Sequence, residues 1–78
     1  PVLQRIFPIE KKHVTVGNLV WIGAGSIIMP GVELGDYCIV AANSFVNTSF
    51  EDFSIIGGNP AKLIRRFTDD EKQKMFEK

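Results

Sequence analysis

The feature that most constrains this chain is an aliphatic residue that recurs every six positions. The members of the repeat are Val16, Ile22, Ile28, Leu34, Val40 and Val46. A glycine, proline or asparagine follows each of them within three residues, which is typical of a turn after a short strand. Neither the 3.6-residue period of a helix nor the alternation of a long strand fits this pattern. The period instead indicates a repeat architecture whose unit is one short strand and one corner.

Each unit is interpreted as a three-residue strand followed by a three-residue corner, with side chains that alternate within the strand. If the aliphatic position points inward, so does the residue two before it, which is Val14, Val20, Ser26, Val32, Cys38 or Ser44. These side chains are small or medium-sized, as a narrow interior requires. Three strands close a triangle, so residues 18 apart stack at about 4.8 Å. The predicted fold is all-β, a parallel β-helix of about two coils.

The middle residue of each strand points outward, and the stacking decides which of these residues share a face. The pairs are Thr15 with Glu33, Trp21 with Ile39, and Ile27 with Phe45. The first pair is polar and the other two are apolar. Because exposed apolar patches usually mark association surfaces, we expect a homo-oligomer. The alternative is that the tails fold back over one face.

The chain is predicted to be one small domain with four segments. They are an irregular N-terminal segment (1–13), the β-helix coils (14–51), an exit segment (52–67) and a C-terminal helix (68–78). The helix is predicted because Thr68 and Glu71 have the spacing of a capping box. Two coils leave strand edges open at both ends, and solenoids usually need three or more repeats. We therefore expect the chain to be the C-terminal part of a longer protein.

Composition argues against several classes of function. Nine basic and nine acidic residues balance, and no basic block stands out in the first sixty residues, so nucleic-acid binding is not expected. No apolar run reaches the roughly 18 residues of a membrane span. A single cysteine, Cys38, fits a reducing compartment and predicts a cytoplasmic location. One histidine and one cysteine cannot supply three zinc ligands, so no metal site is expected.

Three short motifs give the chain a family resemblance. They are Val-Trp-Ile-Gly-Ala-Gly at 20–25, Pro-Gly-Val-Glu-Leu-Gly at 30–35, and Ile-Ile-Gly-Gly-Asn-Pro-Ala-Lys at 55–62. With these motifs, residues 14–66 resemble the C-terminal end of a hexapeptide-repeat acyltransferase, whose fold is a left-handed parallel β-helix. The likeness is greatest to the sugar and polysaccharide O-acetyltransferases, a group that includes maltose and galactoside acetyltransferases. The variable N-terminal coils of that group have no counterpart here.

The resemblance implies an acetyl-CoA-dependent O-acetyltransferase that acts on a sugar or polysaccharide hydroxyl. It also implies a homotrimer with active sites between neighbouring subunits. The pantetheine arm would meet corner backbone groups, and basic residues after the exit motif would lie near the CoA phosphates. By position, the implied CoA-binding residues are Ala24, Ala42, Asn47, Thr48, Lys62 and Arg65, with Arg66 assisting. Relatives often have Thr-Lys where this chain has Asn47-Thr48, so one cation is missing from that contact.

Acetyl transfer to a hydroxyl needs a base for the proton and donors for the oxyanion. The family uses a histidine as the base, and this chain has one, His13. In sugar acetyltransferases the principal histidine lies further upstream, whereas in serine acetyltransferases a second histidine, which contacts the acceptor, has the spacing of His13. His13 is therefore a candidate for the acceptor pocket or the base. The alternative is a solvent-exposed histidine beside Lys11 and Lys12.

Other interpretations remain open beside this enzyme. One is a non-catalytic β-helix module for assembly or regulation, although the exit motif with Lys62 and Arg65 argues against it. A second is a serine-acetyltransferase-like enzyme. A γ-class carbonic anhydrase would need three zinc histidines, and an ice-binding β-helix would need a threonine ladder where only Thr15 faces outward. Cys38 takes an inward slot, which predicts packing rather than nucleophilic catalysis.

Overall fold

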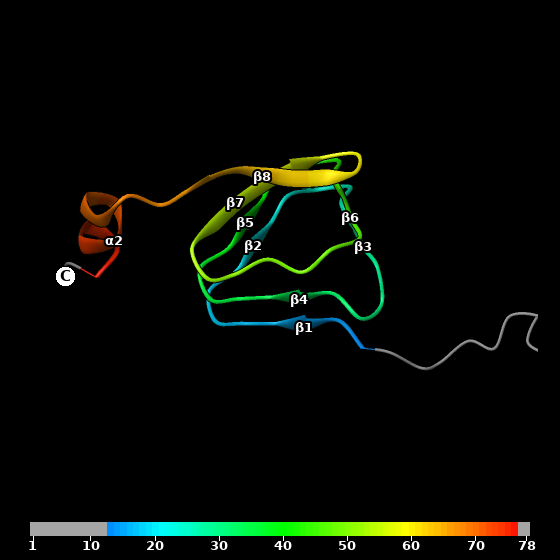
Figure 1. The fold of residues 1–78 in the computed structure, drawn as a ribbon, viewed down its shortest axis with the longest axis horizontal. Helices are drawn as coiled ribbons and strands as arrows, with labels where there is room; N and C mark the ends of the chain where they lie inside the picture. Colours follow the sequence, from blue (N-terminus) through cyan, green and yellow to red (C-terminus); the bar gives the residue numbers. More distant parts are fainter. Residues whose placement is uncertain (1–12, 77–78) are drawn as a thin grey trace, which may run out of the picture.

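The computed structural model describes residues 13–76 of the 78-residue chain, and these residues form eight strands and one helix. The strands are β1 (Thr15–Val16), β2 (Trp21–Ile22), β3 (Ile27–Ile28), β4 (Glu33–Leu34), β5 (Ile39–Val40), β6 (Phe45–Val46), β7 (Ser54–Gly58) and β8 (Ala61–Arg66), and the helix is α2 (Asp69–Met75). Figure 1 shows the strands around the sides of a prism, from which the end of β8 and α2 lead away. Of the predicted N-terminal segment, all but His13 lies outside the described residues.

Each of the first three strands pairs in parallel with the strand that follows 18 residues later. The pairs are β1 with β4, β2 with β5 and β3 with β6, each in a different sheet. Their registers place Thr15 opposite Glu33, Trp21 opposite Ile39, and Ile27 opposite Phe45. The six-residue period predicts these same three pairs, so its stacking and its assignment of faces are confirmed.

The corners repeat a left-handed backbone conformation at every sixth residue. The φ angles are 52° at Leu19, 76° at Gly25, 89° at Gly31, 61° at Tyr37 and 59° at Asn43. Glycine adopts this region freely and asparagine tolerates it, whereas leucine and tyrosine do so at a cost of about 1–2 kcal/mol each. Repetition at a fixed interval indicates that the corner geometry belongs to the fold rather than to any one side chain.

The buried core lies on the exit-segment side of the prism. Its apolar members are Val32, Leu34, Cys38, Val40, Val46, Ile56 and Ala61. The equivalent aliphatic positions nearer the N-terminus are not buried as expected, since Val16 and Ile22 are both 42% exposed. The reason is that, within residues 13–76, no strand stacks on the outer edges of β1 and β2. Cys38 is fully buried and donates to the Glu51 carbonyl at 3.1 Å, in accordance with a packing role.

The exit segment contains two strands that the sequence pattern did not predict. β7 continues the sheet of β2 and β5, with Ile56 opposite Val40, and β8 then returns antiparallel to β7. A side chain at Gly57 would lie 2.9 Å from the Ala41 Cβ and 3.1 Å from the Ile64 Cδ1. Glycine at this position therefore allows β8 to close over β7.

The helix begins with the predicted capping box. The Thr68 hydroxyl accepts from the Glu71 N–H at 3.2 Å, and the Glu71 carboxylate accepts from the Thr68 N–H at 2.9 Å. The helix ends at Met75, and residues 77 and 78 of the predicted helical segment lie outside the described residues. No helix within residues 13–76 is long and apolar enough to span a membrane.

Four aromatic rings connect α2 to the corners of the prism. Tyr37 and Phe53 are stacked with centroids 5.1 Å apart, and Phe76 meets Tyr37 edge-on at 5.3 Å. Phe67 contacts Phe53 edge-on at 6.4 Å, and the Lys72 ammonium lies 4.7 Å from the Phe53 centroid. Aromatic pairs in this geometry contribute about 0.5–1.5 kcal/mol each beyond area burial. These contacts therefore attach the short helix to the prism.

The contrast between Ile56 and Ile64 provides a test of this core. Ile56 is 0% exposed and Ile64 is 60% exposed. We expect Ile56→Ala to lower the free energy of unfolding by about 2–5 kcal/mol, because it leaves a cavity at the centre of the prism. The matched variant Ile64→Ala should change it by less than about 0.5 kcal/mol. Urea titrations of both variants check this, and equal losses would contradict the assignment of the core.

Candidate functional site

Three of the residues that the family resemblance implicates in CoA binding come together at one pocket, hereafter the Lys62 pocket. Its volume is about 370 Å³, and it is lined by Asn47, Thr48, Phe50, Pro60, Ala61, Lys62 and Leu63. Asn47 and Thr48 come from the corner after β6, while Lys62 is the second residue of β8. The pocket forms because β8 folds back toward this corner. The pocket therefore brings together side chains that lie 14 or 15 positions apart in the sequence.

The lining of the Lys62 pocket combines a few polar groups with an apolar wall. Lys62 is exposed, and within residues 13–76 its ammonium has no carboxylate partner. The Thr48 hydroxyl donates to the Asn47 side-chain oxygen at 3.4 Å. Phe50, Pro60 and Leu63 supply apolar surface. An unpaired cation beside an apolar wall suits a ligand with both a phosphate and an aliphatic arm.

Phe50 joins this pocket to two neighbouring hollows. One, of about 340 Å³, is lined by Ser49, Phe50, Glu51, Ser54, Leu63 and Arg66. The other, of about 420 Å³, is lined by Thr15, Gly17, Glu33, Leu34, Gly35, Ser49, Phe50 and Glu51. The sequence pattern does not predict Phe50, because this residue does not follow the six-residue repeat. Phe50 forms an isolated parallel β-bridge with Leu34, which is 16 rather than 18 residues away. Only its aromatic type, after the last regular repeat, could have drawn attention to it.

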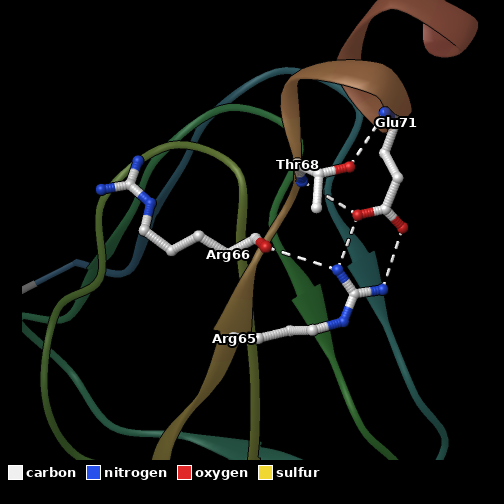
Figure 2. A network of polar contacts seen from close by, with 4 residues as sticks. All are labelled: Arg65, Arg66, Thr68 and Glu71. Carbon is white, nitrogen blue, oxygen red and sulfur yellow. Dashed lines mark hydrogen bonds and ion pairs between the residues drawn. The ribbon is translucent and has the colours of Figure 1, made fainter.

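Arg65 does not line the Lys62 pocket but forms a two-pronged ion pair with the helix, which Figure 2 shows. Its Nη1 donates to Glu71 Oε1 at 2.6 Å and its Nη2 to Oε2 at 2.9 Å. The hydrogen bond from Arg65, aided by the Thr68 N–H, lowers the pKa of Glu71 to about 2. The same hydrogen bond raises the pKa of Arg65. One expected phosphate ligand is therefore paired with a carboxylate.

Arg66 points to the opposite side of β8 (Figure 2). Its Nη1 contacts Glu51 Oε2 at 2.8 Å, and its Nη2 donates to the Asp52 carbonyl at 2.6 Å. The three cations near the exit motif therefore do not form a common cluster. Of Lys62, Arg65 and Arg66, only Lys62 lacks a carboxylate partner among the residues described.

The remaining candidates lie at other places on the prism. Ala24 and Ala42 are 18 residues apart on one corner, where the Ala24 carbonyl accepts from the Asn43 N–H at 3.0 Å. Neither alanine lines the Lys62 pocket. His13 is exposed just before β1, and its carbonyl accepts from the Gly31 N–H at 3.2 Å. His13 is not among the residues that line the Lys62 pocket.

In the part of the chain that is described, no three histidine, cysteine, aspartate or glutamate side chains gather as they would to hold a metal. The polar groups near the Lys62 pocket are instead an amide, a hydroxyl and an ammonium. Such groups bind anions and hydroxyls through hydrogen bonds.

Comparison with known proteins agrees with this arrangement of repeats. Residues 13–48 match the family described as bacterial transferase hexapeptide (six repeats). Over 62 residues the chain is 53% identical to a probable macrolide acetyltransferase from Lysinibacillus sphaericus, covering 80% of this chain and 34% of that protein. Over 56 residues it is 46% identical to a chloramphenicol acetyltransferase from Agrobacterium fabrum, covering 72% of this chain and 27% of that protein.

A solved structure shows the same similarity in three dimensions. A galactoside acetyltransferase in complex with coenzyme A superposes with a TM-score of 0.71 at 37% identity, covering 76% of this chain and 30% of that one. The chain therefore belongs to the hexapeptide-repeat acyltransferase family. It spans about a third of the length of the curated relatives it matches.

The Glu71 pKa determines how the Arg65–Glu71 pair affects stability as the pH changes. The pKa falls from an ordinary value of 4.5 to about 2 on folding, so the unfolded chain binds this proton more tightly. The stabilisation is fully present above about pH 4.5 and is lost as the pH falls toward 2. We expect the difference in unfolding free energy between wild type and Glu71→Gln to shrink across this window. Urea titrations at several pH values measure it, and a pH-independent difference would contradict the assignment.

Proposed function

We propose that the protein is an acetyl-CoA-dependent O-acetyltransferase that acts on a sugar or polysaccharide hydroxyl. In this proposal residues 14–51 form about two coils of a left-handed parallel β-helix, and the chain supplies the CoA-binding part of the enzyme. The observation that carries the proposal is the Lys62 pocket, where Asn47, Thr48 and a cation without a carboxylate partner among residues 13–76 meet. Support also comes from the relative that was solved with coenzyme A.

The proposed roles follow from the chemistry of each group. Lys62 contacts a CoA phosphate, because a point charge at the mouth of an apolar pocket suits an anionic group. Asn47 and Thr48 contact the ligand at the corner after β6, and Ala24 and Ala42 offer corner backbone groups to the pantetheine arm. The apolar wall at Phe50 and Leu63 accommodates aliphatic parts of the ligand. No metal enters the proposed mechanism.

The proposed reaction is a direct acetyl transfer. A base takes the proton of the acceptor hydroxyl, the oxygen attacks the thioester carbonyl carbon, and the CoA thiolate leaves. His13 is proposed for the acceptor pocket or as the base, since a histidine gains and loses a proton near neutral pH. Because His13 does not line the Lys62 pocket, we favour the acceptor side for it. The match covers 34% of the probable macrolide acetyltransferase, so a principal base upstream of His13 is compatible with the comparison.

Two kinds of acceptor are supported by the names of relatives. The galactoside acetyltransferase favours a sugar hydroxyl. The probable macrolide and the chloramphenicol acetyltransferases favour an antibiotic that carries a hydroxyl. The shared chemistry is O-acetylation of an alcohol. We place the enzyme in the cytoplasm, where a single free thiol such as Cys38 stays reduced.

A binding experiment tests the proposal through its cations. We expect Lys62→Ala/Arg65→Ala to weaken CoA binding at least about tenfold, because each variant position loses a charge-assisted hydrogen bond. Lys74→Ala, on α2, removes one positive charge outside the pocket and should leave affinity unchanged. Isothermal titration calorimetry measures all three proteins. No binding by wild type would favour the alternative of a non-catalytic assembly module.

The proposed homotrimer rests on the apolar faces of the prism. Trp21 is 71% exposed and Ile27 is 57% exposed, each on a different sheet. We expect light scattering to report three chains per particle. Trp21→Lys should dissociate the trimer, because it places a charge in an apolar contact. The control Thr15→Lys, on the polar face opposite Glu33, should not, and a folded wild-type monomer would contradict the proposal.

A further inference from the structure

One carboxylate performs two tasks at the junction of β8 and α2. Glu71 Oε1 accepts from the Thr68 N–H at 2.9 Å, which completes the capping box of the helix. The same atom and its partner Oε2 accept from both terminal nitrogens of Arg65. The helix cap and the orientation of the guanidinium therefore depend on a single side chain, as Figure 2 shows.

Two N–H groups of the Arg65 guanidinium have no acceptor among the described residues. A guanidinium has five N–H groups in a fixed plane. Glu71 takes one from Nη1 and one from Nη2, and the Arg66 carbonyl takes the second from Nη1 at 3.3 Å. The second N–H of Nη2 and that of Nε have no acceptor among the described residues. These two groups form one edge of the plane, and that edge matches two oxygens of a phosphate.

We propose that Glu71 is a positioning residue for Arg65, which holds the guanidinium so that its Nε–Nη2 edge is presented to a CoA phosphate. This inference rests on the proposed function. The Arg65 side chain is 51% exposed, so an incoming anion can reach it. Fixing a long flexible side chain in advance removes an entropy cost that binding would otherwise include. The opposing effect, attraction reduced by the nearby carboxylate, is weakened by solvent at so exposed a pair.

The substitution Glu71→Gln separates the two tasks of this side chain. Glutamine also completes a capping box, so the helix keeps its start. The glutamine amide offers only one acceptor oxygen, so the bidentate contact with Arg65 is lost. Thr68→Ala is the matched control, because it weakens the cap and leaves the contact between carboxylate and guanidinium in place.

Titration calorimetry with CoA and with pantetheine, which carries no phosphate, tests the proposal. We expect Glu71→Gln to weaken CoA binding about twofold to tenfold and to leave pantetheine binding unchanged. In an Arg65→Lys background, which lacks the planar guanidinium, Glu71→Gln should have no further effect on CoA affinity. Thr68→Ala should bind CoA as wild type does.

The contrary outcomes are distinct. Tighter CoA binding by Glu71→Gln would show that Glu71 competes with the phosphate, and equal binding would show that it does not position Arg65. A loss of CoA affinity in Thr68→Ala equal to that in Glu71→Gln would assign the effect to helix stability. Each of these results overturns this inference and leaves the proposed function intact. If the wild type binds no CoA, the proposed function and this inference fail together.

Discussion

The vertical ladder of backbone hydrogen bonds between residues about 18 apart is the constraint on which the rest of the structure depends. Typical rungs are Thr15 N–H to the Val32 carbonyl at 3.1 Å and Ile27 N–H to the Ser44 carbonyl at 2.8 Å. Strands of two residues are far too short to be stable alone, so each exists only because another lies beside it. A slip of one residue in the register would turn every inward side chain outward. The recurring left-handed corner fixes the length of each repeat, and it therefore also fixes which side chains enter the core.

The candidate site forms where this ladder ends. Between β1 and β4 the spacing is 18 residues, but the next rung joins Leu34 to Phe50, only 16 residues on. The aspartates at one corner follow the same change, since Asn18 N–H donates to Asp36 and Asp36 N–H donates to Asp52. After this shift the chain reverses direction into β8 and leaves the hollows around Phe50. A perfectly regular repeat would offer flat faces, so the interruption is what provides a pocket.

The six-residue period made the regular part of this fold predictable. The features that were not predicted lie where the sequence has no such period or depend on contacts between elements. The pairing of Trp21 with Ile39 and the burial of Val40 follow from counting, because the ladder acts on every repeat alike. The capping box at Thr68 was also predictable, because it depends only on Glu71, three residues further along the chain. The hairpin of β7 and β8 has no such signal, since a short apolar run is compatible with several structures. The partial exposure of Val16 depends on what stacks against it, and the Arg65–Glu71 pair depends on how a strand meets a helix.

For the proposed anionic ligand, the charge arrangement favours recognition at contact over attraction at a distance. The chain has no formal net charge, and two of the three cations near the exit motif are paired with carboxylates. A broad basic surface would attract any polyanion, and it would do so more weakly as salt screened it. Here one ammonium, which has no carboxylate partner within residues 13–76, lies at an apolar pocket, and one guanidinium is held in its plane by Glu71. If the proposed CoA binding holds, the ligand would gain from both groups only when its phosphates and its apolar part have the right spacing, so selectivity would follow from shape.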